Sequence, residues 1–308
     1  MVKFVERSCP LCGTSELGKE LVGLSFDEKV IGRVTFSARK NPDKLHHRMV
    51  VCPSCDLAYA NPVLDSQWIR EQYVGASFLT PIESSYAARN HERILLRVLS
   101  LLPDREEALD IGAGDGAFLS ILRNRGFTKL SGVEPSIESI EQSAGSVRHS
   151  ISNSFFCGSS YEKDQFSLIT CFQTLEHVDE IEQLAKSAFR ILKPGGVLLV
   201  SAHNYRSLSA SVLKTRSPIY DIEHLQLFSK KSLSAMLKLS GFKIHRVKIM
   251  RSDYPVEYWI RLAPLWSPVK KLLYKTLKNI GVDKCVLPIW AGNIWAYGIK
   301  PTTAPIAK

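Results

Sequence analysis

Alternating glycines and one carboxylate are the residues of this chain whose types and spacing best suit ligand binding. Gly112, Gly114 and Gly116 follow the segment 109–111, which has the pattern of a buried strand end. Glycines at such a junction let the backbone turn sharply and let a ligand lie on the main chain. Glu134 ends a second expected strand, where its carboxylate can accept hydrogen bonds from two ribose hydroxyls. We therefore predict a nucleoside cofactor held by Asp110, Gly112, Ala113, Gly114, Glu134 and Gln173.

Two Cys-x2-Cys pairs near the N-terminus have the spacing of a metal site: Cys9, Cys12, Cys52 and Cys55. Each pair can aim two thiolates at one point, and two pairs complete a tetrahedral sulfur site. Such a site has no open coordination position, so we predict one structural zinc ion. A redox Cys-x-x-Cys motif is the alternative, but it normally occurs once. His46 and His47 lie between the pairs and could compete as ligands, but with four cysteines available we expect them to be surface polar residues.

Three histidines fall beyond the expected carboxyl ends of strands, where open α/β sheets bind ligands. His177 follows the fourth expected strand, His203 the fifth, and His224 lies in a polar stretch before the next helix. A histidine can remove a proton from an acceptor near neutral pH. We predict His224 as the base, with Glu223, Tyr220 and His177 as further catalytic residues. Each histidine could instead be a structural hydrogen-bonding residue.

The chain of 308 residues divides into four expected segments. Residues 1–62 form the zinc-binding module, 63–250 the core, 251–291 an insertion, and 292–308 the last strand and tail. Strands and helices alternate in the core, which predicts an α/β fold with a mainly parallel sheet. No apolar run approaches the roughly 18 residues that span a bilayer, and residues 1–7 do not resemble a signal peptide. We expect a cytoplasmic protein.

Positive charge is concentrated in the C-terminal third. Residues 201–308 hold 18 Lys and Arg against 5 Asp and Glu, although the whole chain has a net charge of +10. This imbalance favours an anionic partner, such as a phosphate-bearing acceptor, nucleic acid or an acidic membrane, or it is a solvated surface. Within the insertion, residues 267–280 have the pattern of a basic amphipathic helix. Such a helix can lie on a membrane, cover a pocket, or pack on its own domain.

The motifs also follow one another in an ordered series. After the glycine turn and Glu134 come a strand over 166–172, Gln-Thr-Leu-Glu-His-Val at 173–178, Leu-Lys-Pro-Gly-Gly at 192–196 and a strand over 197–201. This series resembles the class I S-adenosylmethionine-dependent methyltransferases. The resemblance implies a Rossmann-like sheet of seven strands, mainly parallel, with an antiparallel last strand at 293–299. It also implies that the glycine loop holds the methionine part of S-adenosylmethionine and that Glu134 holds the ribose.

The zinc module and the Glu-His-Leu…Phe-Ser segment at 223–229 resemble a narrower group, bacterial methyltransferases of sugars and natural products. In the sugar C-methyltransferases of that group, a Tyr-x-Glu-His segment contributes the proton-transfer residues. Here Tyr220 lies one residue further from the Glu-His pair, and His203 stands where relatives commonly have proline.

Three functions compete at this stage. The first is methyl transfer to a small molecule such as a sugar, a glycan or a lipid-linked intermediate, with peripheral contact to the inner face of the membrane through 267–280. The second is methylation of ribosomal RNA, because zinc-containing RNA methyltransferases share this fold and a basic surface. The third is cofactor binding without turnover. The sequence leaves open the acceptor, the choice among O-, N- and C-methylation, and the oligomeric state.

Overall fold

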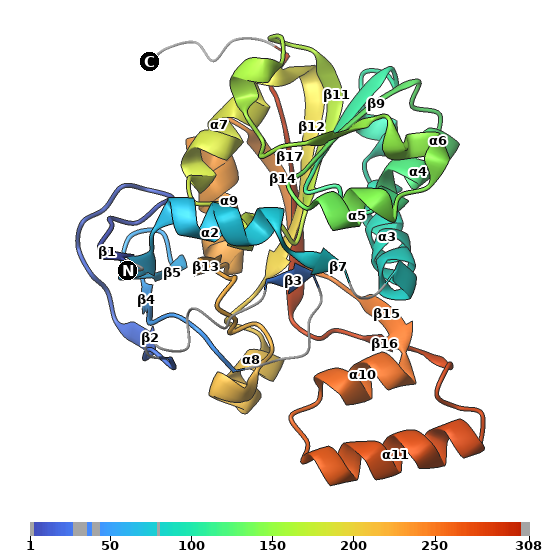
Figure 1. Cartoon of the computed structure of the whole chain (residues 1–308). Coiled ribbons are helices and arrows are strands. Elements are labelled where there is room, and N and C mark those ends of the chain that lie inside the picture. Colours follow the sequence, from blue (N-terminus) through green and yellow to red (C-terminus); the bar gives the residue numbers. More distant parts are fainter. Residues whose placement is uncertain (1–2, 27–35, 39–43, 79–80, 303–308) are drawn as a thin grey trace.

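Seven strands form the central sheet of the computed structural model, which describes residues 3–26, 36–38, 44–78 and 81–302 (Figure 1). The order across the sheet is β10-β9-β8-β11-β12-β17-β14. β17 runs antiparallel to both neighbours, and every other neighbouring pair is parallel. The predicted Rossmann-like sheet with an antiparallel last strand is therefore confirmed. The strands are β8 (Glu107–Ile111), β9 (Lys129–Glu134), β10 (Ile151–Asn153), β11 (Phe166–Phe172), β12 (Leu192–His203), β14 (Lys243–Ile249) and β17 (Asn293–Ile299).

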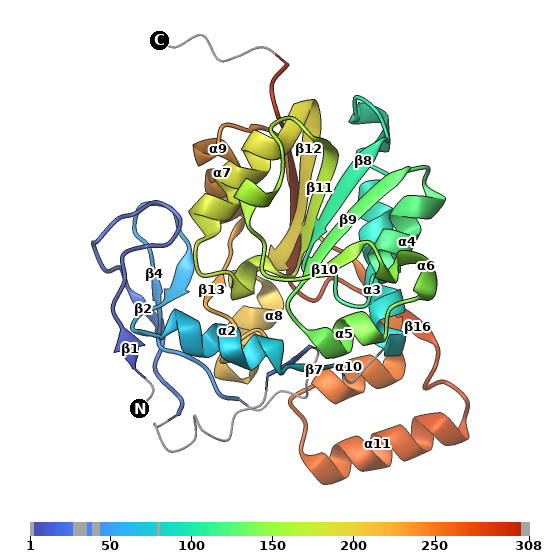
Figure 2. The same cartoon turned by 45° about the horizontal axis from the view of Figure 1, so that its top comes forward.

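Helices cover both faces of the sheet (Figure 2). α3 (Pro81–Leu95) and α4 (Ala117–Asn124) share one apolar cluster with the sheet, and α7 (Ile181–Ile191) and α9 (Lys230–Leu239) share another on the opposite face. β11 is buried along its whole length because helices cover it on both sides. Short helices complete the core: α5 (Ile137–Glu141), α6 (Gly145–Arg148), α8 (Leu208–Leu213), and the 3-10 turns η1 (Leu99–Leu101), η2 (Gly158–Ser160), η3 (Leu175–His177) and η4 (Lys214–Arg216).

Local sequence explains where two of these helices begin. α4 starts after Gly116, whose φ of 70° is a left-handed conformation that suits glycine. α9 starts at Ser229, which forms a reciprocal capping box with Ser232. The first start places the glycine turn at the carboxyl end of β8, and the second ends the polar stretch that contains His224. Both sequence features therefore set the edges of the candidate site.

The N-terminal module is built on a small antiparallel sheet with the order β13-β5-β4-β2. β13 (Gln226–Leu227) comes from the polar stretch beside His224, so a strand of the core segment completes the sheet of the module. β1, within the predicted module, pairs with β6, which lies just after the predicted module boundary at residue 62. That boundary stays a prediction. The other elements are β1 (Phe4–Val5), β2 (Glu20–Val22), β3 (Ser37–Ala38), β4 (Met49–Val51), β5 (Ala58–Ala60), β6 (Val63–Leu64), α2 (Ser66–Val74) and β7 (Ser77–Phe78).

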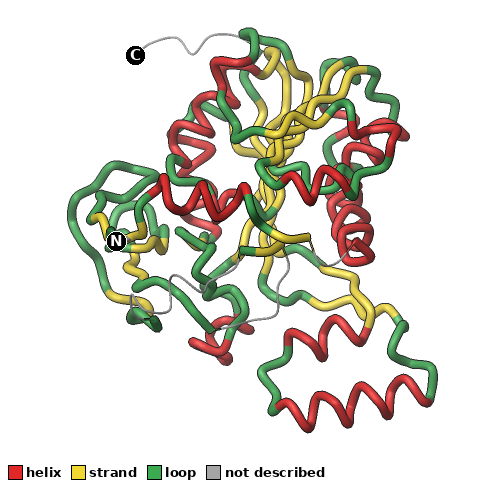
Figure 3. Tube along the Cα trace, in the orientation of Figure 1, coloured by secondary structure: helices red, strands yellow, loops and turns green. Residues whose placement is uncertain are grey.

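The insertion between β14 and β17 projects from one end of the core (Figure 3). It comprises the antiparallel pair β15 (Ser252–Pro255) and β16 (Val286–Ile289), with α10 (Val256–Leu262) and α11 (Ser267–Asn279) between them. α11 is the basic helix expected near 267–280. It packs beside α10, and none of its side chains is buried. Among the described residues, no helix is long and apolar enough to cross a membrane.

Candidate active site and metal centre

The glycine turn is fastened to the neighbouring strand by its own backbone. The amides of Gly112 and Ala113 both donate to the carbonyl of Val133, at 2.9 and 3.0 Å. A Cβ on Gly112 would lie 2.2 Å from Oγ1 of Thr174, so packing alone requires glycine there. A Cβ on Gly114 would meet no atom within 4 Å. Thr174 thus fills the space beside Gly112, whereas the space beside Gly114 is empty and can take a ligand against the main chain.

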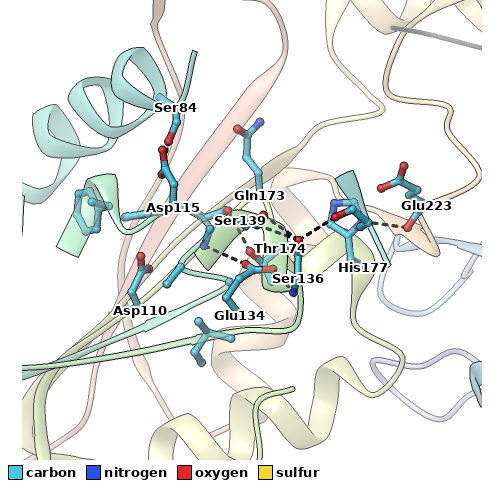
Figure 4. A pocket seen from close by; sticks show the side chains of 18 of the residues that line it. Ser84, Asp110, Asp115, Glu134, Ser136, Ser139, Gln173, Thr174, His177 and Glu223 are labelled. Carbon is cyan, nitrogen blue, oxygen red and sulfur yellow. Dashed lines mark hydrogen bonds between the residues drawn. The ribbon is translucent and has the colours of Figure 1, made fainter. Parts of the chain in front are cut away.

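Two carboxyl groups lie beside this turn, that of Asp110 buried and that of Glu134 half-buried (Figure 4). Glu134 accepts hydrogen bonds from the amides of Gly114 and Ser136, both at 2.9 Å. Burial raises the pKa of Glu134. Asp110 accepts a hydrogen bond from Oγ1 of Thr170 at 2.6 Å, while burial, together with the charge of Glu134, raises its pKa to about 7. A carboxylate has about four acceptor sites, so Glu134 retains capacity for hydroxyl groups of a ligand.

One cavity of about 400 Å³ opens over these groups. All six residues predicted to hold the cofactor line it: Asp110, Gly112, Ala113, Gly114, Glu134 and Gln173. Phe155 and Phe156, which follow β10, line it as well and provide apolar rings for a nucleobase. The cavity therefore has the groups that S-adenosylmethionine requires: a backbone loop, an acceptor for ribose and an apolar wall.

His177, His203 and His224 meet in the same cavity. The ring centroid of His224 lies 4.9 Å from that of His177 and 5.0 Å from that of His203. Nδ1 of His224 lies 2.7 Å from the carbonyl oxygen of Ile219. Because a carbonyl only accepts, the neutral ring carries its proton on Nδ1 and its lone pair on Nε2. His224 thus has the tautomer that a general base needs.

Tyr73 of α2 joins this group, although sequence patterns did not single it out. Its hydroxyl lies 2.5 Å from Nδ1 of His177 and 3.2 Å from the carbonyl oxygen of Glu223. Burial and nearby carboxylates, first that of Glu223, raise its pKa well above the usual range, so the hydroxyl stays protonated. Nothing in the sequence could identify Tyr73, because a tyrosine near a helix end is common and its partner His177 is 104 positions away.

Of the two other predicted catalytic residues, one lines the cavity and the other does not. Glu223 lines the cavity (Figure 4). Tyr220 is buried among module residues, with its ring 5.9 Å from that of His46, and it is not among the residues that line the cavity. The expectation that His46 and His47 are surface residues is wrong. Both are buried, because the stretch before β13 covers them and Nε2 of His47 lies 3.1 Å from the carbonyl oxygen of Ile222.

The insertion contributes the far wall of the cavity through β15 and α10, whereas the sequence had offered its basic helix at 267–280 as a pocket cover. The rings of Tyr254 and Tyr258 stack at 4.0 Å, and Arg261 forms an ion pair of 2.5 Å with Glu83 of α3. His91, also from α3, stacks on Phe172 at 4.1 Å. These aromatic rings give this end of the cavity an apolar lining, and the ion pair of Arg261 with Glu83 ties α10 to α3.

The four predicted metal ligands form one cluster. Sγ of Cys9 lies 3.5 Å from that of Cys55, Sγ of Cys12 lies 3.5 Å from that of Cys52, and all four sulfurs lie within 4.8 Å of one another. Zinc–sulfur bonds of about 2.3 Å in a tetrahedron put the sulfurs about 3.8 Å apart, so this cluster fits a structural zinc ion.

This fold and this site define a nucleoside-binding α/β domain, and comparison with known proteins gives its family. The model of a methyltransferase domain family matches residues 84–247, slightly more than half of the chain. The chain belongs to this methyltransferase family, which confirms the predicted S-adenosylmethionine-dependent class and its cofactor at the level of the family.

Individual relatives are more distant. The chain is 28% identical over 122 residues to a ubiquinone biosynthesis O-methyltransferase of Actinobacillus pleuropneumoniae. The matched region covers 35% of this chain and 50% of that protein. The chain spans 40 to 53% of the length of three curated relatives that it matches.

Solved structures were also compared. A putative methyltransferase of Bacillus halodurans matches at a TM-score of 0.48 and 17% identity, over 69% of this chain and all of that one. Geranyl diphosphate C-methyltransferase of Streptomyces coelicolor matches at a TM-score of 0.45 and 15% identity, over 76% and 82%.

Proposed function

We propose that this protein transfers a methyl group from S-adenosylmethionine to a small molecule and that His224 removes the proton of the acceptor. The observation that carries the proposal is the tautomer of His224, whose Nδ1 proton is engaged by the Ile219 carbonyl within the cavity of the glycine turn. A base that faces the same cavity as the cofactor groups can act on an acceptor aligned with the donor. Alignment itself supplies much of the acceleration of such an in-line transfer.

Each residue of the site has a role in this proposal. S-adenosylmethionine supplies an electrophilic methyl group when it is bound. Asp110, Gly114, Glu134 and Gln173 hold the cofactor, with Glu134 on the ribose. His224 takes the proton of the acceptor on Nε2 and becomes a cation, which the carboxylate of Glu223 stabilises. Tyr73 and His177 hold the adjoining backbone through the carbonyl of Glu223.

The acceptor that we favour is a sugar, a glycan or a lipid-linked intermediate with a phosphate. Tyr254 and Tyr258 support it through their ring faces at the cavity end nearest the insertion, and the excess of Lys and Arg over Asp and Glu in residues 201–308 supports the phosphate. Ribosomal RNA is the alternative acceptor. A panel of nucleotide-linked sugars, polyprenyl-phosphate sugars and ribosomal RNA, assayed by methyl incorporation, distinguishes the two. Incorporation into RNA alone would overturn the small-molecule proposal.

We further propose that α11 brings the protein to an anionic membrane surface. Lys271, Lys275 and Lys278 lie on one side of this helix by their spacing and are exposed. Trp266, before α11, and Trp290, after β16, are 75% and 61% exposed, and tryptophan favours the headgroup region of a bilayer. Positive charge beside exposed tryptophan suits a surface of acidic lipids. A lipid-linked acceptor would be presented at that surface, next to the wall that α10 contributes.

The decisive test of the base is His224→Ala. Loss of a positioned general base costs about 10²–10⁴ in rate, so we expect at least a hundredfold loss of turnover with unchanged binding of S-adenosylhomocysteine. His177→Ala should be milder. His245→Ala is the matched control, because His245 is exposed and stacks on Tyr297 of β17. Turnover within a few fold of the unmodified protein in His224→Ala would show that alignment alone suffices or that another histidine is the base.

A further inference from the structure

The backbone around His224 is held by residues of the N-terminal module. β13, which begins two residues after His224, pairs with β5 in the register Gln226–Tyr59 and Leu227–Ala58. The amide of Ala60 donates to the carbonyl of Leu225 at 2.8 Å. The histidine segment is therefore the edge strand of the zinc module as well as the wall of the cavity.

Arg7 makes the strongest of these connections. Its guanidinium donates to the carbonyl oxygens of Ala60 at 3.1 Å and of Leu225 at 2.8 Å, and it lies 3.4 Å from Oε1 of Gln226. A single cation thus joins β5 to the residue that follows His224. Hydrogen bonds that involve a charged group contribute roughly twice as much as neutral ones. Arg7 lies two residues before Cys9, so the metal cluster determines where its backbone sits.

Two further contacts hold the residues just before His224. His47 contacts the carbonyl of Ile222 at 3.1 Å, and Tyr73 donates to the carbonyl of Glu223 at 3.2 Å. The carbonyls at 222, 223 and 225 therefore all meet partners that precede residue 75 in the sequence.

The second cysteine pair holds the two ends of the same loop. Asp56, which directly follows Cys55, accepts hydrogen bonds from the hydroxyl of Tyr205 at 3.0 Å and from Nε of Arg206 at 2.8 Å. Its carbonyl accepts from Oγ of Ser229 at 3.2 Å. Tyr205 and Arg206 follow β12, and Ser229 caps α9. One residue beside a metal ligand thus fixes where the loop that contains His224 leaves the sheet and where it re-enters the core.

We propose that the zinc module positions His224, with Arg7 and His47 as positioning residues. The inference rests on the proposed role of His224 in proton removal. Displacement of a reacting group by about 1 Å can cost roughly a hundredfold in rate, so a module that fixes the carbonyls of Ile222 and Leu225 on either side of the base affects turnover without touching the substrate. The metal cluster then contributes to catalysis through backbone position alone.

The test compares two arginines of the same module. Arg7→Met removes the donors to Leu225 and keeps most of the apolar stem. Arg48→Met is the matched control, because Arg48 binds Glu20 and the carbonyl of Asn61, within the module. Both variants should retain one equivalent of zinc and normal affinity for S-adenosylhomocysteine. Only Arg7→Met should accelerate amide exchange over residues 219–229, by at least about tenfold, as expected for loss of a charge-assisted hydrogen bond.

Nitrogen NMR of ¹⁵N-histidine protein gives a readout that general destabilisation would not change. The Nδ1–H signal of His224 should be lost or averaged in Arg7→Met and restored in Arg7→Lys. His47→Leu should give the same change and covers the case in which Arg7→Met does not fold. An unchanged His224 signal and unchanged exchange over 219–229 in either variant would overturn the positioning role. These measurements need no acceptor, so they stand even if His224→Ala proves active and the proposed base is wrong.

Discussion

Asp110 gives the cofactor site a pH dependence at the scale of a single residue. Its pKa of about 7 arises first from burial and then from the charge of Glu134. S-adenosylmethionine carries a sulfonium and an ammonium group, and a cation nearby favours the ionised carboxylate. The pKa of Asp110 should therefore fall when the cofactor binds. Binding then releases a proton below about pH 7, and affinity rises with pH up to that value, by at most about tenfold per unit.

Calorimetry in two buffers of different ionisation enthalpy measures this proton release. At about pH 6 we expect nearly one proton per cofactor bound, and less than a quarter of a proton at about pH 8. Asp110→Asn should abolish the release and flatten the pH profile of affinity. Equal proton release by the variant and the unmodified protein would show that another group, such as Glu134, is the source.

At the scale of single elements, α11 gives a prediction about membranes. Lys270 does not belong to its exposed basic row, because Nζ of Lys270 donates to the carbonyl of Arg261 at 2.7 Å. The informative variant is therefore the triple change of Lys271, Lys275 and Lys278 to glutamine. Each basic group near an acidic bilayer contributes about 1 kcal/mol, so the triple variant should bind acidic liposomes at least tenfold more weakly.

Co-sedimentation with acidic and neutral liposomes checks this prediction. Three exposed lysines of α9, Lys230, Lys231 and Lys238, provide a control with the same change in charge. Equal binding by the α11 and α9 variants would contradict a specific contact. Equal sedimentation with both kinds of liposome would remove the electrostatic argument altogether.

The accuracy of the sequence predictions also differed between elements. The glycine turn, Glu134 and the alternation of strands and helices follow from local patterns, since spacing and periodicity reflect the strand and the turn directly, whereas the antiparallel last strand followed from the family resemblance. The four cysteines were likewise predictable, because a tetrahedral metal site needs four ligands and each of the two equally spaced pairs supplies two. β13 was not predicted: two residues without clear periodicity pair with β5 only because the core brings them there. Tyr73 and the buried position of His47 were missed for the same reason, because their partners lie more than a hundred positions away.

At the scale of the whole molecule, the zinc ion should stabilise more than the module. We expect about one equivalent of zinc by elemental analysis and loss of that metal in Cys52→Ser. Because β13 belongs to the module's sheet, the variant should also lose protection from amide exchange over 219–229 and unfold at a lower temperature. Cys285→Ser is the control, since Cys285 is exposed and outside the cluster.

A metal content of Cys52→Ser equal to that of the control would contradict the assignment of the site. Unchanged amide exchange over 219–229 after metal loss would instead show that the zinc ion does not stabilise this segment of the core. A chelator should reproduce the effects of Cys52→Ser, because a closed four-sulfur site releases its ion mainly when the surrounding chain unfolds.

Arg7 and its partner Leu225 are 218 positions apart in the sequence, which has a consequence for folding during synthesis. Chains emerge from the ribosome N-terminus first, so both cysteine pairs are available to zinc long before β13 has been made. During that interval β5 presents an unpaired strand edge, the kind of edge that invites association with other chains. A nascent chain can thus hold its metal while the histidine has no fixed position. If His224 is the base, as proposed, the pairing of β5 with β13 fixes it only after the metal cluster can form, and chaperones that shield the open edge would be expected to raise the yield of active protein more than added zinc does.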